Sequence, residues 1–342
     1  MRKSLPLRVV LLLVSTLCAS ALSAGPDAAF AQGESPAKAG IEDLLSSVVR
    51  IKTYINPDGR TVENLGMERD GSGIVIDDSG LVLTIGYLMV EAHAAEIITN
   101  DGRKIPANVV GYDNDTGFGL LKAVAPLKVH PMLFGKSAEL KVGDPGLAAS
   151  FGGRDGIAPA FVVSRREFAG SWEYLIDGAI YTAPAHSHWS GAALITKEGR
   201  LVGVGSLIVG DATGSGGDTA GNMYVPTDLL TPILADLIAN GAVGGTPKPW
   251  IGLNTQVVER GLVVARVTPS GPAEKAGLKK GDLITNIAGA EPKTLPDFYR
   301  KLWSLGSAGI LVPIDVQRDG KSEHFDVQSI NRMEHLKLKS SL

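Results

Sequence analysis

Short runs of β-branched and other apolar residues, separated by turn residues, fill most of the chain from residue 41 to about residue 228. The runs predicted to be strands are residues 48–54, 73–77, 81–84, 107–112, 120–124 and 200–208. Short strands at this spacing are typical of β-barrels and exclude a helical bundle. The composition agrees, because 42 Gly and 19 Pro favour frequent turns. The sequence therefore predicts a mainly β fold.

The length of 342 residues is enough for about two domains. The most punctuated stretch, residues 241–249, is the predicted linker, because it is rich in Gly and Pro. The first domain is then residues 41–240 and ends in a helix predicted over 228–239, with Asp228 as N-cap and Gly241 after its end. The second domain is residues 250–331, with strands at 261–267 and 282–287 and helices at 272–276 and 294–305. We assign no function to the polar tail, residues 332–342.

The N-terminus has the pattern of a secretory signal. Arg2, Lys3 and Arg8 precede an apolar run over 9–17, and Ala29-Phe30-Ala31 fits a signal peptidase. We expect a cleavable signal peptide at 1–31, a flexible lead-in at 32–40 and a periplasmic protein without a permanent membrane span. An uncleaved, tethered form is the alternative.

Composition also limits the possible chemistry. The only cysteine, Cys18, lies in the predicted signal, so the mature chain has no disulfide, no thiol nucleophile and no thiolate zinc site. The formal net charge of −3 gives no electrostatic basis for nucleic-acid binding. We expect no cofactor, no metal and no nucleic-acid partner.

Three segments in order resemble the HtrA/Deg family of exported, trypsin-like serine proteases. They are residues 70–77 (DGSGIVID), 80–84 (GLVLT) and 190–204, where Ser190-Gly191 precedes a strand and a Gly-Arg turn. Residues 250–253 (WIGL) and 270–282 (SGPAEKAGLKKGD) resemble the PDZ domain that follows the protease in that family. The resemblance implies a trypsin-like double β-barrel followed by a PDZ domain, and possible homo-oligomers.

The catalytic pattern of that family is degenerate in this chain. Catalysis there needs a serine, a histidine base and a carboxylate that orients the base. Where the family reads Leu-Thr-Asn-x-His, this chain has Tyr87 in place of the histidine, and a phenol with a pKa near 10 keeps its proton at neutral pH. Where the family reads Asp-x-x-Thr-Asp-Leu-Ala, Gly117 replaces the carboxylate.

The serine position is retained as Ser190, but its surroundings differ. The family's Gly-Asn-Ser-Gly-Gly corresponds to residues 188–192, so His188 occupies the position of a glycine whose backbone N–H, with that of Ser190, stabilises the oxyanion. A side chain there restricts backbone angles that glycine adopts freely. We therefore interpret Ser190 as a retained turn serine without catalytic assistance.

Two alternatives use the histidines near Ser190. His186 or His188 is close enough in sequence to act as a relocated base, and the two together form half of a metal site. Neither alternative has a third member in view. Asp113 and Asp115 are interpreted as turn residues, and a register slip that moves Asp115 to the carboxylate position is a further alternative.

The PDZ resemblance implies a peptide-binding groove. The predicted carboxylate-binding loop is Ile251-Gly252-Leu253, whose backbone N–H groups receive a peptide C-terminus, and Leu295 and Phe298 on the facing helix are expected to line the pocket for the last side chain. The leading hypothesis is an exported pseudoprotease that binds peptide C-termini, unfolded polypeptides or an active HtrA-type protease through its PDZ domain and barrel cleft. The alternatives are an active serine endopeptidase with a rearranged site and a structural subunit of a mixed oligomer.

Overall fold

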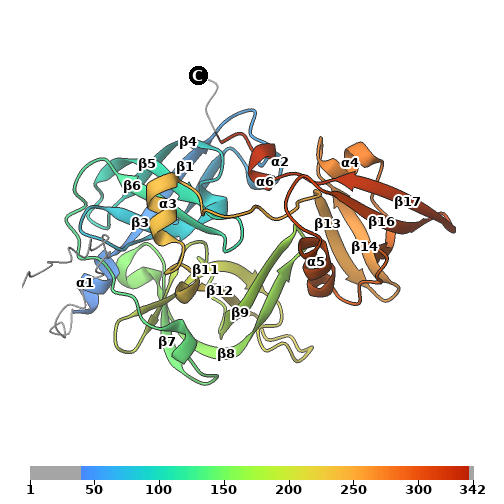
Figure 1. Cartoon of the computed structure of the whole chain (residues 1–342). Coiled ribbons are helices and arrows are strands. Elements are labelled where there is room, and N and C mark those ends of the chain that lie inside the picture. Colours follow the sequence, from blue (N-terminus) through green and yellow to red (C-terminus); the bar gives the residue numbers. More distant parts are fainter. Residues whose placement is uncertain (1–39, 339–342) are drawn as a thin grey trace, which may run out of the picture. The chain divides into compact units, whose positions relative to one another are not determined.

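A computed structural model describes residues 40–338, which form two closed β-barrels and a five-stranded sheet. Figure 1 shows the strands of the barrels in blue to yellow-green and those of the sheet in orange and red. The prediction of a mainly β chain with a double β-barrel followed by a second, smaller domain is confirmed. The predicted signal peptide, and all of the predicted lead-in except Gly40, lie outside the described residues.

The first barrel closes in the order β1-β2-β3-β6-β5-β4. Its strands are β1 (Val48–Ile55), β2 (Glu68–Val75), β3 (Leu81–Ile85), β4 (Ala92–Ile98), β5 (Lys104–Tyr112) and β6 (Phe118–Ala123). The predicted run 73–77 is only the end of β2, whose first half is polar and pairs with β1. That polar half lacks the apolar alternation that predicts a strand, because much of it is exposed or half-buried.

The second barrel closes in the order β10-β11-β12-β9-β8-β7. Its strands are β7 (Pro145–Ala149), β8 (Ile157–Gly170), β9 (Tyr174–Ala183), β10 (Ala193–Thr196), β11 (Leu201–Val209) and β12 (Gly221–Pro226). β8 and β9 are consecutive antiparallel strands and form a long hairpin. Only β11 is among the predicted runs, since β8 mixes charged and small residues.

Apolar side chains fill the space inside and between the barrels. Phe118, Leu83 and Ile74 from the first barrel are in one buried cluster with Tyr181 and Met223 from the second. These side chains are almost completely buried, so the two barrels share one hydrophobic core. One short helix, α1 (Ile41–Ser46), precedes β1. The others lie between strands: α2 (Val62–Leu65) and the 3₁₀ turns η1 (Gly86–Leu88), η2 (Ser137–Glu139) and η3 (Gly153–Gly156).

The prediction of a helix over 228–239 is wrong for the first half of this segment. The chain forms a 3₁₀ turn, η4 (Thr227–Leu229), and the α-helix α3 begins only at Leu234 and ends at Asn240. Pro232 interrupts the segment, because proline has no N–H for a helical hydrogen bond. The Asp228 carboxylate does not cap a helix but accepts hydrogen bonds from the backbone N–H groups of Ser137 and Ala138.

Gly241 ends α3 in the left-handed conformation, with φ 72°. A Cβ there would lie 3.0 Å from the carbonyl oxygen of Val110. Gly241→Ala should therefore lower the free energy of unfolding by about 1 kcal/mol. Thermal melting of the mature protein measures this. The control is Gly210→Ala, where φ is not positive and a Cβ meets nothing within 4 Å; equal melting temperatures for the two variants would contradict the prediction.

The second domain is an antiparallel sheet in the order β13-β14-β15-β16-β17. Its elements are β13 (Leu253–Val258), β14 (Gly261–Val267), α4 (Pro272–Ala276), β15 (Leu283–Ile287), α5 (Leu295–Ser304), β16 (Leu311–Arg318) and β17 (Lys321–Gln328). Thr294 caps α5 by accepting a hydrogen bond from the Asp297 N–H. The buried face of α5 packs on the sheet, as its apolar spacing predicts.

The segment after the second domain, to which the sequence analysis assigns no function, is partly structured. Residues Arg332–His335 form α6, and the His335 ring lies 4.9 Å from the ring of Trp250. The Lys337 N–H donates to the Glu91 carboxylate at 2.6 Å, and the Lys337 carbonyl accepts from Asn56. Sequence pattern does not predict this because α6 is a single turn anchored by distant residues. No helix within residues 40–338 is long and apolar enough to cross a membrane.

Candidate functional site

Ser190 lies in the turn before β10, where the two barrels meet. Its carbonyl oxygen accepts a hydrogen bond from the Ser72 N–H on β2 at 2.8 Å. The next residue, Gly191, has φ 72°, and a Cβ there would lie 2.0 Å from the Ser72 carbonyl oxygen. Only glycine fits this approach of the two backbones. The turn therefore fixes Ser190 against the first barrel.

The hydroxyl of Ser190 is hydrogen-bonded to Tyr87, the predicted replacement for the base. Tyr87 follows β3 in η1, and its phenol oxygen lies 2.6 Å from Ser190 Oγ. The phenol donates its single proton to the Ser206 carbonyl oxygen at 2.9 Å. The Ser190 hydroxyl must then be the donor in its bond to Tyr87.

Tyr87 is a poor acceptor for that proton. Burial raises the pKa of Tyr87 to about 12, and the hydrogen bonds to Ser190 and Trp189 offset only part of this shift. At neutral pH the phenol stays protonated, so it can accept a hydrogen bond from the serine but cannot remove its proton. The pair forms a stable hydrogen-bonded contact without general-base character.

Arg69 holds the Tyr87 backbone in place. Its guanidinium donates to the carbonyl oxygens of Tyr87, at 2.7 Å, and Val90, at 3.1 Å. Burial lowers the pKa of Arg69 to about 10, although the nearby Glu91 carboxylate raises it. Because this pKa is well above 7, Arg69 remains charged at neutral pH. No sequence motif points to Arg69 or to the Ser206 carbonyl, because both act through backbone groups distant in the chain.

The position of the predicted missing carboxylate, Gly117, has no room for a side chain. Gly117 has φ 79°, and a Cβ there would lie 2.9 Å from the Tyr174 hydroxyl. Tyr174, on β9, donates this hydroxyl to the Thr116 carbonyl oxygen at 2.6 Å. A tyrosine from the second barrel thus fills the space next to Gly117. Sequence analysis did not identify Tyr174, which is 57 positions away in the sequence.

The two nearby aspartates are turn residues, as interpreted from sequence. The Asp113 carboxylate accepts from the backbone N–H groups of Asp115 and Thr116 and from the Thr116 hydroxyl. Asp115 forms an ion pair with Lys248 at 2.8 Å. Neither carboxylate is directed at Tyr87 or Ser190 through a hydrogen bond.

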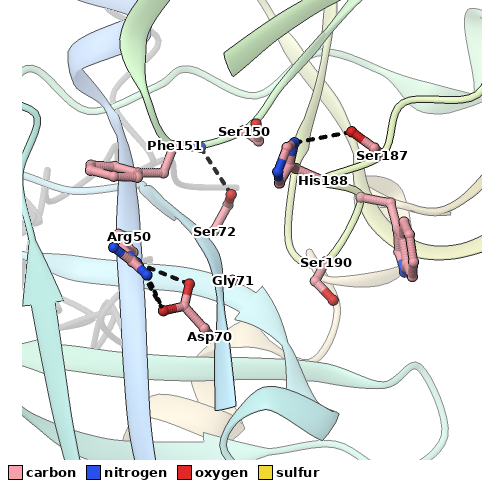
Figure 2. Close-up of a pocket in the computed structure, with 10 residues that line it drawn as sticks. Arg50, Asp70, Gly71, Ser72, Ser150, Phe151, Ser187, His188 and Ser190 are labelled. Atoms are coloured by element: carbon pink, nitrogen blue, oxygen red, sulfur yellow. Dashed lines mark hydrogen bonds and ion pairs between the residues drawn. The ribbon is translucent and has the colours of Figure 1, made fainter. Parts of the chain in front are cut away.

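The two histidines nearest in sequence do not bond to Ser190. His186 is buried, with Nε2 3.2 Å from Ser150 Oγ and its backbone N–H on the Asn222 side chain. Burial lowers the pKa of His186, and proximity to His188 lowers it further. His188 is exposed and bonds through Nδ1 to Ser187 at 3.1 Å. Figure 2 shows the Ser190 hydroxyl directed away from the His188 ring.

These contacts weigh against His186 or His188 as a relocated base in this conformation. Within residues 40–338, Tyr87 is the side chain that hydrogen-bonds to Ser190 Oγ, and no histidine nitrogen does so. The same part of the chain contains no group of three His, Cys, Asp or Glu side chains arranged to hold a metal ion. His188, the predicted oxyanion position, does not adopt a positive φ.

A pocket of about 400 Å³ opens beside Ser190. Its polar wall includes Arg50 and Asp70, whose side chains form an ion pair with a shortest distance of 2.6 Å between Nη2 and Oδ2. Phe151 and His188 form other parts of the lining (Figure 2). The arrangement is a cleft with a hydroxyl and mixed polar and aromatic walls. Such a cleft has the size and the mixed lining of a ligand site, and within residues 40–338 Tyr87 is the side chain that hydrogen-bonds to its serine.

The predicted peptide-binding residues lie together in the second domain. Gly252 has φ 79°, and Ile251, Leu253, Leu295 and Phe298 are buried in one apolar cluster. The backbone N–H groups of 251–253 converge on a carboxylate, as predicted for a carboxylate-binding loop. That carboxylate belongs to Glu173 of the β8–β9 hairpin, which sequence analysis did not identify.

Comparison with protein families gives two matches. Residues 71–204 match the family described as trypsin-like peptidase domain. Residues 249–328 match the PDZ domain family. The two matches cover both predicted domains in the predicted order.

Several curated periplasmic proteases are similar to the chain. A probable periplasmic serine endoprotease DegP-like of Brucella suis is 29% identical over 272 residues, covering 75% of this chain and 52% of that protein. A probable periplasmic serine protease do/HhoA-like of Haemophilus influenzae is 29% identical over 265 residues, covering 74% and 56%. The chain thus spans about half the length of these relatives.

Among solved structures, the HtrA-type protease AlgW with decapeptide shares the fold. The two chains are 22% identical with a TM-score of 0.51, over 86% of this chain and 99% of AlgW. The prediction of an HtrA-type arrangement of peptidase and PDZ domains is confirmed.

Proposed function

Because this chain joins a trypsin-like peptidase domain to a PDZ domain, we propose that it is an HtrA-like pseudoprotease of the periplasm that binds polypeptides without cleaving them. The observation that carries the proposal is the Tyr87–Ser190 contact of 2.6 Å. The Ser190 hydroxyl is hydrogen-bonded to a phenol whose pKa of about 12 keeps it protonated at neutral pH. Such a phenol does not remove the serine proton, so Ser190 is not activated for nucleophilic attack. Gly117 leaves no orienting carboxylate, and Tyr174 fills its place.

The proposed ligands are peptide C-termini, unfolded polypeptides or an active HtrA-type protease. The PDZ domain supports the first, since PDZ domains bind an extended peptide along a sheet edge with its terminal carboxylate on backbone N–H groups. The solved structure of AlgW with a decapeptide is consistent with this ligand class. The periplasmic relatives support the compartment. The proposed protein also associates with further copies of itself as a homo-oligomer.

The second candidate is an active serine endopeptidase of periplasmic protein quality control, and the relatives' names state a periplasmic serine endoprotease or serine protease. It requires a base for Ser190 other than Tyr87. His188 is the candidate, because it is exposed and lines the same pocket.

Hydrolysis of unfolded casein by the mature protein distinguishes the two candidates. We expect no cleavage and no labelling by a fluorophosphonate probe, because loss of the base alone removes about a million-fold in kcat from a serine protease site. The matched control is Ser190→Ala. Cleavage and labelling that disappear in this control would overturn the pseudoprotease proposal, and a His188→Ala variant would then test the candidate base.

A further inference from the structure

The tip of the β8–β9 hairpin lies against the carboxylate-binding loop of the PDZ domain. The Glu173 carboxylate accepts hydrogen bonds from the N–H groups of Ile251 at 3.1 Å, Gly252 at 2.7 Å and Leu253 at 2.9 Å. Glu173 is only 4% exposed. Successive backbone N–H groups that converge in this way form an anion site, and here a side chain of the same chain fills it.

The hairpin tip also bonds to the free edge of the sheet. β13 is the edge strand, paired with β14 on one side. On its free edge, the Thr255 N–H donates to the Ser171 carbonyl oxygen at 3.0 Å. N–H groups two residues apart point to the same edge of a strand, so the Leu253 N–H, on the Glu173 carboxylate, and the Thr255 N–H bind the tip from this edge. One carboxylate bond and one backbone bond to an edge strand are contacts that a peptide C-terminus makes in strand addition.

The helix opposite β13 holds the other side of the hairpin. The Tyr299 hydroxyl on α5 donates to the Gly170 carbonyl oxygen at 2.6 Å and accepts from the Glu173 N–H at 3.1 Å. Ala169 and Leu175, on either side of the tip, pack against the apolar core of the PDZ domain. The segment therefore lies between β13 and α5, the place where a PDZ domain holds its peptide.

The tip is built to present its carboxylate. Glu173 has φ 58°, a left-handed conformation that side chains rarely adopt. The ring of Trp172 turns back and stacks on Tyr174, with centroids 5.7 Å apart, and the Phe168 ring lies 6.1 Å from each. This aromatic cluster fixes the hairpin so that the backbone turn points Glu173 at the loop.

We propose that residues 171–173 are an internal ligand of the PDZ groove, and that an external peptide with a free C-terminal carboxylate binds only by displacing Glu173. The inference rests on the proposed peptide-binding function. Each N–H of the loop has one proton, so the three donors that hold Glu173 cannot also hold a terminal carboxylate. The groove is shared between two ligands of the same chemistry.

The chemistry of the two carboxyl groups favours exchange. Burial raises the pKa of Glu173 to about 7, although the three N–H groups and Arg332 lower it. A peptide C-terminus has an ordinary pKa of about 3.5 and is fully ionised at neutral pH. The incoming group therefore brings a complete negative charge to a site where Glu173 is only partly ionised.

The test compares the wild-type mature protein, residues 32–342, with Glu173→Ala. Hydrogen exchange followed by mass spectrometry reports the N–H groups of 251–253 without any ligand. Fluorescence anisotropy then measures binding of labelled decapeptide pools ending in Val, Leu or Phe, each made with a free carboxylate and as an amide. The matched control is Glu167→Ala, which removes another hairpin carboxylate that contacts α5 through Arg300 but does not touch the loop.

We expect Glu173→Ala to speed exchange at the loop and to bind the free-carboxylate pools at least about 10-fold more tightly, as removal of a competitor that occupies the site nine-tenths of the time requires. Glu167→Ala should match wild type. Unchanged loop exchange in Glu173→Ala would overturn the internal ligand, and the affinity of the wild type for the pools would still decide the proposed function. Faster exchange with no binding by any form would overturn peptide binding and, with it, the competition.

Discussion

Mature protein with Tyr87→His is expected to react with a fluorophosphonate probe about 50-fold faster than wild type at pH 8. The size follows from serine protease sites in which loss of the histidine is about that much worse than loss of the orienting carboxylate, so a base without its aspartate recovers only this part. An imidazole with a pKa near 6.5 is neutral at pH 8 and can take the Ser190 proton. The imidazole reaches less far than the phenol, and the Ser190 side chain can adopt another of its three staggered rotamers to bring Oγ to the imidazole.

Two further variants separate a new base from the mere loss of a phenol. Tyr87→Phe removes the hydroxyl that binds Ser190 but adds no base, so its labelling rate should equal that of wild type. Tyr87→His combined with Ser190→Ala should show no labelling. Equal acceleration by Tyr87→Phe and Tyr87→His would mean that Ser190 already has a base and that Tyr87 only restrains it.

Loss of the Asp282 carboxylate should destabilise the PDZ domain by about 3 kcal/mol or more. Asp282 is 1% exposed and accepts from the Arg318 guanidinium, at 2.7 Å to each oxygen, and from the Lys279 N–H. In Asp282→Ala the guanidinium keeps the half-exposed Glu323 carboxylate and the Gly277 carbonyl but loses its buried partner, and the Lys279 N–H loses its acceptor. Removal of one member of a buried pair is costly because the hydrogen bonds of the other member are lost inside the domain. Urea unfolding followed by Trp fluorescence measures the change.

Glu323→Ala is the matched control for this prediction. Glu323 binds the same guanidinium at 2.9 Å, but its side chain is 38% exposed. An exposed ion pair contributes about 0.5 kcal/mol, so this variant should unfold close to wild type. A loss in Asp282→Ala no larger than that in Glu323→Ala would show that the buried pair does not stabilise the domain.

Features that depend on local pattern were predictable from the sequence. The β14 and α4 boundaries agree with the predicted 261–267 and 272–276, and Thr294 caps α5 at the predicted start. Tyr87 and Gly117 could also be singled out from the sequence, because both fall inside motifs with fixed spacing, and the structure places Tyr87 2.6 Å from Ser190 Oγ. Such motifs place a residue on a strand end without any knowledge of distant contacts.

Features that depend on contacts across the chain were not predictable. Tyr174 meets Thr116, and Glu173 meets residues 251–253, through hydrogen bonds between segments far apart in sequence. The same applies to α6, which is too short to be stable alone and packs on Trp250. An acidic residue in a hairpin gives no local signal that its partner is a distant loop.

The tyrosine beside Gly117 links two properties of the protein that are otherwise separate. An aspartate at position 117 would be strained, because φ is 79° there and its Cβ would lie 2.9 Å from the Tyr174 hydroxyl. A second change that shortens Tyr174 would make room, but it would also remove the ring on which Trp172 stacks beside Glu173. Room for a carboxylate at position 117 and a firmly held hairpin tip therefore depend on the same tyrosine, so a change of Tyr174 that favours the first is expected to weaken the second.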